Sequence, residues 1–105
     1  MKKSVKISVI IPVYNGAKFI KKCLDRLIEQ NFKESFEIII IDDASTDNSI
    51  ELIKKYKLSN LKLFKLSVNS GQSAARNIGI KKSVGEYIFF QDIDDLISQR
   101  TFSTL

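Results

Sequence analysis

Three carboxylates lie within four residues near the end of the chain, at Asp92, Asp94 and Asp95. They follow Gln91 and the apolar run YIFF. Because like charges repel and burying them costs free energy, we expect the cluster at an exposed strand end with a cation to neutralise it. Oxygen ligands of this kind suit Mg²⁺ or Mn²⁺. The alternative is a solvated acidic turn without a ligand.

A second pair of carboxylates, Asp42 and Asp43, follows four consecutive isoleucines. Alone, this pair could be a surface turn or could cap the next helix. Open α/β sheets bind ligands at the carboxyl ends of their strands. Two strands that both end in acid therefore predict one shared site.

Composition narrows the chemistry that these carboxylates can serve. Histidine is absent, which excludes histidine acid–base catalysis and the usual zinc sites. The one cysteine, Cys23, lies on an apolar helix face and cannot form a disulfide within the chain, so we expect a buried thiol. The net charge of +5 comes from lysine pairs that are not interleaved with aromatic residues, so we expect solvated lysines and no nucleic-acid partner.

The elements that must position the carboxylates alternate along one domain of 105 residues. Apolar patterning predicts strands at 7–13, 38–41, 61–66 and 87–90, and helices at 19–28, 49–57 and 72–83. The uninterrupted second and fourth runs are typical of strands buried on both faces, and the third is typical of an edge strand. This alternation predicts a Rossmann-like, three-layer α/β/α fold with a parallel sheet. Strand order 3-2-1-4 would bring Tyr14, Asp43 and Asp92 to one rim.

Three local signals refine these elements. Asn48 followed by Glu51 has the form of a capping box for the second helix. Gly79, inside the third helix, costs about 1 kcal/mol relative to alanine and indicates close packing of helix on sheet. Gly85 is expected to stop that helix.

The first thirteen residues imitate a signal peptide, with early lysines and then apolar residues. The apolar run is broken by Ser8 and Pro12 and is far shorter than the ~20 residues of a membrane span. We expect a cytoplasmic chain, with the cytoplasmic face of the membrane as an alternative location.

Four segments resemble successive motifs of the family 2 glycosyltransferases, which have the GT-A fold. They read VIIPVYNG, IIIIDDASTDNS, NSGQSAARNIGI and FFQDIDDL, in the family's order and spacing. Any one of them is weak, but four in order are specific and cover almost the whole chain. The resemblance implies that residues 1–105 form the half of a GT-A domain that binds the nucleotide-sugar donor, and that the acceptor-binding half lies outside them.

The resemblance also implies roles for individual residues. Pro12 and Tyr14 match positions that line the base, and Asp43 matches the residue that hydrogen-bonds it. Arg76 matches a contact to a base carbonyl or diphosphate oxygen. The implied nucleotide-binding set is Pro12, Val13, Tyr14, Asn15, Asp42, Asp43, Arg76, Gln91, Asp92 and Ile93, in which Asp42 helps to shape its turn. The implied metal ligands for Mg²⁺ or Mn²⁺ are Asp92 and Asp94 of the D-x-D motif, together with Asp95.

The implied activity is transfer of a sugar from a UDP-sugar to a polysaccharide, lipid-linked or protein acceptor. Gln91 departs from the apolar residue that the family places there. The family's general base is expected beyond residue 105, so no catalytic residue is assigned and this stretch alone should not transfer sugar. Apolar surface near Leu96, Ile97 and Phe102 is expected to favour homo-oligomers.

The residues fit two other classes of function less well. Receiver domains and aspartate phosphatases need an acid after the first strand, which here ends in PVYN. A non-catalytic remnant or interaction module would lack metal-dependent nucleotide binding. Dinucleotide and P-loop sites are disfavoured because neither glycine-rich motif is present.

Overall fold

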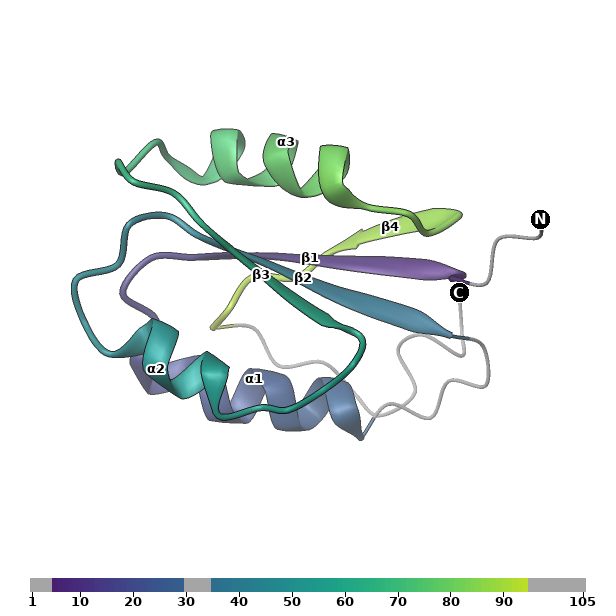
Figure 1. The fold of residues 1–105 in the computed structure, drawn as a ribbon, viewed down its shortest axis with the longest axis horizontal. Helices are drawn as coiled ribbons and strands as arrows, with labels where there is room; N and C mark the ends of the chain where they lie inside the picture. The colour runs from purple at the N-terminus through teal and green to yellow at the C-terminus, as the bar shows by residue number, and fades with distance from the viewer. Residues whose placement is uncertain (1–4, 30–34, 95–105) are drawn as a thin grey trace.

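The computed structural model describes residues 5–29 and 35–94, in which strands and helices alternate (Figure 1). Four parallel strands form one sheet in the order β3-β2-β1-β4. In Figure 1, α3 covers one face of this sheet and α1 and α2 cover the other. The predicted three-layer architecture and strand order are confirmed. The elements are β1 (Ile7–Val13), α1 (Ala17–Ile28), β2 (Phe36–Asp42), α2 (Ser49–Lys54), β3 (Leu61–Lys65), α3 (Gln72–Lys82) and β4 (Tyr87–Phe90).

The four isoleucines of β2 are buried because helices cover both faces of the sheet. Successive side chains of a strand point to opposite faces. Ile38 and Ile40 belong to the core under α1 and α2, whereas Ile39 and Ile41 belong to the core under α3. Cys23 is buried in the first of these cores, as predicted.

The prediction that the run of residues 87–90 is buried on both faces is wrong. β4 pairs only with β1 among the described strands, and α3 packs on β1 and β2. Tyr87 is 60% exposed and Phe90 is 47% exposed, while Phe89 packs partly against the core under α1 and α2. The third strand, β3, is an edge strand of alternating burial, as predicted.

Helix ends also differ from the sequence expectations. α1 begins at Ala17, two residues earlier than expected, and α2 ends at Lys54, three residues earlier. The predicted capping box is wrong, because Asn48 makes no side-chain cap bond. Its backbone (φ −92°, ψ 26°) is not in the extended region that aims an N-cap side chain at the helix amides.

Gly79 marks close packing of α3 on the sheet, as predicted. A Cβ added to Gly79 would lie 2.4 Å from Cγ2 of Ile10, a fully buried side chain of β1. Helix and sheet therefore approach more closely here than any other residue type would allow.

We expect Gly79→Ala to lower the free energy of unfolding by about 1–3 kcal/mol, the usual cost of overpacking a core. The sign is diagnostic, because alanine in an exposed helix interior stabilises by about 1 kcal/mol relative to glycine. Urea titration measures the change, and Gly79→Ala should cost less in an Ile10→Ala background, because that substitution removes Cγ2. A more stable Gly79→Ala protein would show that the helix can move away at no cost.

A buried carboxylate joins the amino-terminal ends of three strands, opposite the acidic rim. Glu37 on β2 is 2% exposed and accepts bonds from the Ser8 hydroxyl (2.6 Å), the Val84 amide (2.8 Å) and the Lys62 ammonium (2.9 Å). Burial raises the pKa of Glu37, but these bonds outweigh it and hold the pKa below its usual value. Because the Val84 amide lies between α3 and β4, the carboxylate fixes where β4 begins.

The expectation that Gly85 stops α3 is wrong, because Gly85 contacts the amino-terminal end of the sheet instead. α3 stops at Lys82, and Ser83 already has extended backbone angles. The Gly85 amide donates to the Ser8 hydroxyl (2.8 Å), and a Cβ at Gly85 would lie 2.7 Å from the Ser8 backbone nitrogen. The glycine is required by this close approach.

Two expectations concern surfaces. No helix in the part of the chain that the structure describes is long and apolar enough to cross a membrane. Leu96, Ile97 and Phe102, on which the expected homo-oligomer rests, lie outside the described residues.

Candidate functional site

A pocket of about 380 Å³ lies at the carboxyl edge of the sheet. The β1 end, the β2 end, the segment after β4 and the start of α3 all contribute to it. Strand register explains the convergence, because Val13 on β1 pairs with Asp42 on β2 and Ile10 pairs with Phe90 on β4. Five of its lining residues belong to the predicted nucleotide-binding set: Pro12, Val13, Tyr14, Asp43 and Ile93. The other three were not predicted: Asn69, Gly71 and Gln72.

Of the three missed residues, Asn69 and Gly71 lie in the loop that leads into α3, and Gln72 is the first residue of that helix. They belong to the NSGQ stretch that begins the third motif. From that motif, only Arg76 was predicted to bind the nucleotide. Gly71 has φ +92°, a left-handed conformation that glycine adopts at no steric cost. Two adjacent features, a polar loop with glycine and a helix start, could have indicated this side of the pocket.

Asp43 joins the loop to the end of β2. It is 4% exposed, and its two carboxylate oxygens accept hydrogen bonds from the amides of Ser70 (2.7 Å) and Gly71 (2.8 Å). Its own amide donates to the Val13 carbonyl (2.7 Å). Each carboxylate oxygen has a second acceptor site, so Asp43 can hold the loop and still accept a bond from a ligand.

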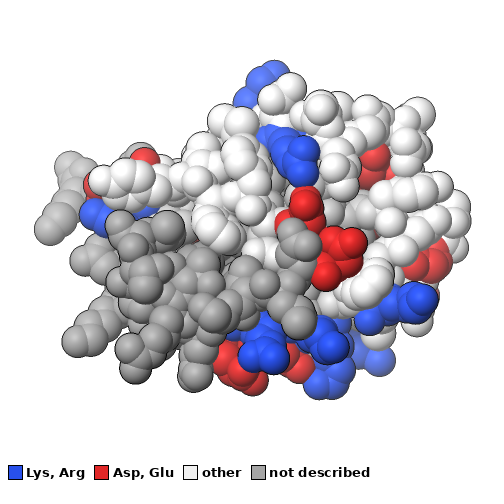
Figure 2. Space-filling view, turned by 180° about the vertical axis from the view of Figure 1, so that it is seen from behind, with Lys and Arg blue, Asp and Glu red and all other residues white. Residues whose placement is uncertain are grey.

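Arg76 reaches the acidic turn across the end of the sheet. Its Nη2 lies 2.9 Å from Oδ1 of Asp92, and both side chains are partly exposed. The sequence showed no base near Asp92, because α3 supplies this one from sixteen residues away. On the face shown in Figure 2, acidic and basic surfaces meet near the middle, and further basic surface follows the lower edge, where α1 lies in Figure 1.

The predicted metal ligands are only partly described. Asp94 is exposed, and Asp95 lies outside the described residues. Within residues 5–29 and 35–94, no three His, Cys, Asp or Glu side chains are grouped closely enough to hold a metal ion. Mg²⁺ is commonly held by one or two carboxylates plus substrate phosphates. Asp92 and Asp94 fit a cation of that kind, which arrives with a diphosphate.

Three other predicted residues have side chains engaged within the fold. The Asn15 carbonyl oxygen accepts bonds from the amides of Thr46 (2.7 Å) and Asp47 (3.2 Å). The buried Gln91 donates to the Asp92 carbonyl (2.8 Å) and so supports the acidic turn. A role for Asn15 and Gln91 in binding nucleotide stays a prediction.

Asp42 is the third of these residues, and it is fully buried. Its Oδ2 accepts the Ser45 amide (2.9 Å), as expected for a residue that shapes the turn. Its Oδ1 has no hydrogen-bond partner among the described residues.

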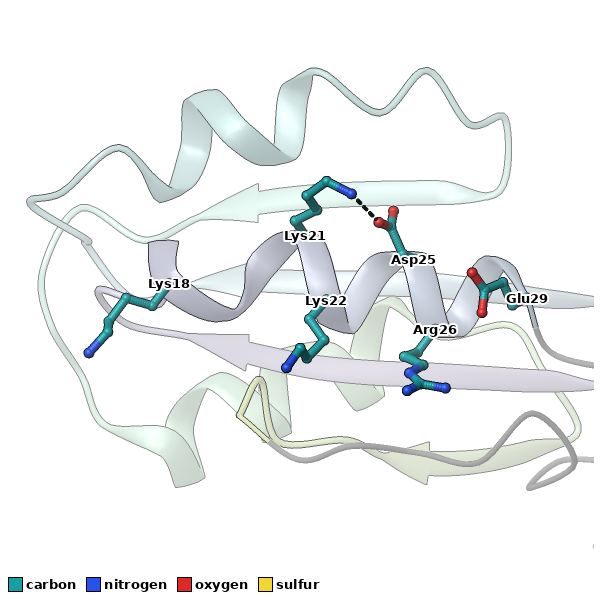
Figure 3. A pocket seen from close by; sticks show the side chains of 6 residues that line it. All are labelled: Lys18, Lys21, Lys22, Asp25, Arg26 and Glu29. Atoms are coloured by element: carbon teal, nitrogen blue, oxygen red, sulfur yellow. Dashed lines mark hydrogen bonds and ion pairs between the residues drawn. The ribbon is translucent and has the colours of Figure 1, made fainter.

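A second hollow lies on the outer surface of α1, away from the carboxyl edge (Figure 3). Lys21 and Asp25 form an ion pair at 2.7 Å, one turn apart on the helix. Such exposed pairs contribute little to stability. The mixed charges are typical of a solvated helix face, and the lining residues are Lys18, Lys21, Lys22, Asp25, Arg26 and Glu29.

Comparison with known proteins decides the family. The model of the family "Glycosyl transferase family 2" matches residues 8–105. The chain belongs to glycosyltransferase family 2. The four sequence motifs and the resemblance drawn from them are confirmed at this level.

Relatives of this glycosyltransferase chain include two enzymes named for poly(ribitol phosphate). The poly(ribitol-phosphate) beta-N-acetylglucosaminyltransferase TarS of Staphylococcus aureus is 41% identical over 100 residues, which are 92% of this chain and 18% of TarS. The poly(ribitol-phosphate) beta-glucosyltransferase of Bacillus spizizenii is 47% identical over 97 residues, 89% of this chain and 15% of that enzyme. The chain thus spans less than a fifth of the length of these relatives.

Solved structures show the same GT-A fold. S. aureus TarS 1-349 in complex with UDP-GlcNAc has a TM-score of 0.90 and 40% identity, over 95% of this chain and 30% of that one. The mannosyltransferase PcManGT from Pyrobaculum calidifontis, in complex with GDP-Man and Mn²⁺, has a TM-score of 0.81 and 28% identity, over 87% of this chain and 28% of that one.

Proposed function

We propose that this glycosyltransferase family 2 chain binds the nucleotide of a UDP-sugar for transfer to a carbohydrate or lipid-linked acceptor. The observation that carries the proposal is the pocket at the carboxyl edge, which combines an aromatic ring, a buried carboxylate and a nearby Arg76–Asp92 pair. The UDP and UDP-GlcNAc complexes of TarS support the choice of uridine. The predicted cytoplasmic location stays part of this proposal.

Tyr14 and Asp43 would recognise the base. The Tyr14 ring is half exposed at the wall of the pocket, where it can pack against a planar base. Asp43 is held by two backbone amides and can accept a hydrogen bond from a base N–H. Because Asp43 is fixed before the ligand arrives, little ordering entropy of this carboxylate opposes binding.

Arg76, Asp92 and Asp94 would hold the diphosphate. A guanidinium suits phosphate oxygens, so Arg76 can exchange its bond with Asp92 for one to the ligand. Asp92 would then be free to hold Mg²⁺ or Mn²⁺ together with Asp94. When bound, the cation would neutralise the charge on the nucleoside diphosphate as it leaves.

We further propose that these residues form the donor half of the active site and do not supply the acceptor's general base. Asp43 is bound to the loop before α3, and Asp92 is paired with Arg76. Asp42 is fully buried. The proposal assigns Asp94 to the metal, so none of these carboxylates is left to deprotonate an acceptor hydroxyl.

Calorimetric titration with UDP, in Mn²⁺ and in excess chelator, tests the proposed donor site. We expect UDP to bind about tenfold more tightly with Mn²⁺, a difference of about 1.4 kcal/mol. Asp94→Ala should remove this difference in affinity, because it removes a proposed metal ligand. Asp94 is exposed, so its replacement should leave the packing unchanged. Glu51→Ala, at an exposed carboxylate on α2, is the matched control and should behave as the wild type.

Two results would contradict the proposal. Equal affinity for UDP in Mn²⁺ and in chelator would show that no metal ion takes part in UDP binding. A folded wild-type protein that binds no UDP under either condition would favour the non-catalytic interaction module instead.

A further inference from the structure

Two loops at the carboxyl edge are joined by hydrogen bonds in both directions. The first loop, residues 14–17, runs from the end of β1 into the first residue of α1, and the second, residues 44–49, leads from β2 into the first residue of α2. The Asn15 amide donates to the Ser45 hydroxyl (2.9 Å), while the Asn15 side chain accepts from the second loop's amides. We call this set of bonds between the two loops the loop clasp.

Asn15 can take this position because of its backbone conformation. Its φ of +51° is left-handed, a region that asparagine tolerates better than most residues. The turn aims its side-chain oxygen at the amides of Thr46 and Asp47. Both amides belong to exposed residues, and Asn15 gives each of them a partner within the chain.

Asp47 supplies the return bonds. Its Oδ2 accepts the amide of Ala17 (3.2 Å), the first residue of α1. Its Oδ1 accepts the amide (2.9 Å) and hydroxyl of Ser49, and the Ser49 hydroxyl in turn accepts the Gly16 amide (3.0 Å). Desolvation raises the pKa of Asp47, but the bonds from Ser49 and Ala17 outweigh it and lower the pKa.

α1 depends on this distant carboxylate for its start. Gly16 at the N-cap position has no side chain, and no cap bond is made there. Asp47 and Ser49 satisfy the first amides from the other loop, and the carboxylate lies at the positive end of the helix dipole. The orientation of the 14–17 loop is therefore set by side chains thirty or more residues away.

Tyr14 lies between two fixed points of this arrangement. On one side, the Val13 carbonyl accepts the Asp43 amide (2.7 Å), and on the other, Asn15 is held by the clasp. Tyr14 itself is 51% exposed, so packing does little to fix its ring. The backbone on either side instead sets the position from which the Tyr14 side chain projects.

We propose that Asp47 is a positioning residue for the base pocket: it holds the backbone that carries Tyr14 without lining the pocket itself. This inference rests on the proposed UDP site. Asp47 is absent from the pocket's lining, which separates its role from direct contact with the nucleotide. Loss of the carboxylate would release the Ala17 amide, and also the Ser49 hydroxyl to which the Gly16 amide donates, and would let Tyr14 move relative to Asp43.

Calorimetry with UDP and Mn²⁺, run beside thermal unfolding, tests the inference. Asp47→Ala should weaken UDP binding about tenfold, the lower end of what supporting residues cost at metal sites. The ratio of affinities with and without Mn²⁺ should not change, because Asp92 and Asp94 are untouched. Asp47→Asn keeps one of the two oxygen acceptors and should recover part of the loss, and Glu51→Ala should bind UDP as the wild type does.

A double-mutant cycle separates positioning from general stability. If Asp47 acts through the Tyr14 ring, Asp47→Ala should cost no further UDP affinity in a Tyr14→Ala background. Ser49→Ala breaks the link to Gly16 and should weaken UDP binding in the same direction, so it serves as a second variant if Asp47→Ala does not fold.

Each outcome has a distinct meaning. An Asp47→Ala protein that melts earlier but binds UDP like the wild type overturns the inference, as do additive effects in the cycle. A wild-type protein that fails to bind UDP overturns the proposed function itself.

Discussion

Replacing Glu37 with alanine is expected to lower the free energy of unfolding by about 2–4 kcal/mol. The carboxylate is buried, and three donors on different elements depend on it: Ser8, Lys62 and Val84. Lys62 is partly exposed and can be solvated, so most of the cost comes from the Val84 amide and the Ser8 hydroxyl. Chemical denaturation at neutral pH measures the change.

The matched control for Glu37 is Glu86→Ala, a half-exposed carboxylate with a long contact of 3.9 Å to Lys6. We expect almost no change there, because surface ion pairs contribute little. Glu37→Gln keeps one acceptor and should fall between the two. If Glu37→Ala lowers the free energy of unfolding no more than Glu86→Ala does, water can replace the hydrogen bonds that Glu37 accepts.

The lowered pKa of Glu37 adds a pH dependence whose sign follows from linkage. The charged form is favoured in the folded chain, so its stabilisation is complete above the unfolded pKa of about 4.3. It is lost as the pH falls through the lower, folded pKa. The stability difference between the wild type and Glu37→Gln should therefore shrink below about pH 4.

Replacing Asp43 with alanine is expected to weaken UDP binding by about 1.5–3 kcal/mol, or roughly 10- to 150-fold. The same change also leaves the amides of Ser70 and Gly71 without their acceptors. Each unsatisfied donor costs about 1–3 kcal/mol if it stays buried, so stability should fall as well.

Asp43→Asn distinguishes the two roles of the carboxylate. Asparagine can keep one loop amide but presents an N–H₂ donor in place of the second oxygen, so UDP affinity should fall further than stability does. Calorimetry and thermal unfolding of both variants are compared with Glu29→Ala, a carboxylate just past the end of α1. If Asp43→Ala melts earlier yet binds UDP like the wild type, the acid serves the loop alone.

Local patterns in the sequence determined the architecture of this chain. The four isoleucines predicted a strand covered on both faces, the ISVIIPV run predicted the first strand, and the alternation with helices predicted a parallel sheet. Since parallel strands align their carboxyl ends, residues that follow the strands were bound to meet at one edge. That is why Tyr14, Asp43 and Asp92 could be assigned to one rim, while the family resemblance implied Pro12, Val13 and Ile93 beside them.

Burial of β4 was decided by the tertiary structure. Four apolar residues in a row predict a covered strand, yet a strand is covered only where neighbouring strands and helices lie beside it. Among the described elements, β4 has β1 on one side, and α3 packs over β1 and β2. No pattern within residues 87–90 records that placement.

Long-range pairs were decided in the same way. Arg76 and Asp92 are 16 residues apart, Asn15 and Thr46 are 31 apart, and Ser8 and Gly85 are 77 apart. Each pair is made by strand register and by the packing of helix on sheet, which set distances that residue spacing does not encode. The sequence by itself determined the family, the sheet and the edge that carries the site. Only the folded chain decided which charges are neutralised there and which side chains hold the pocket in place.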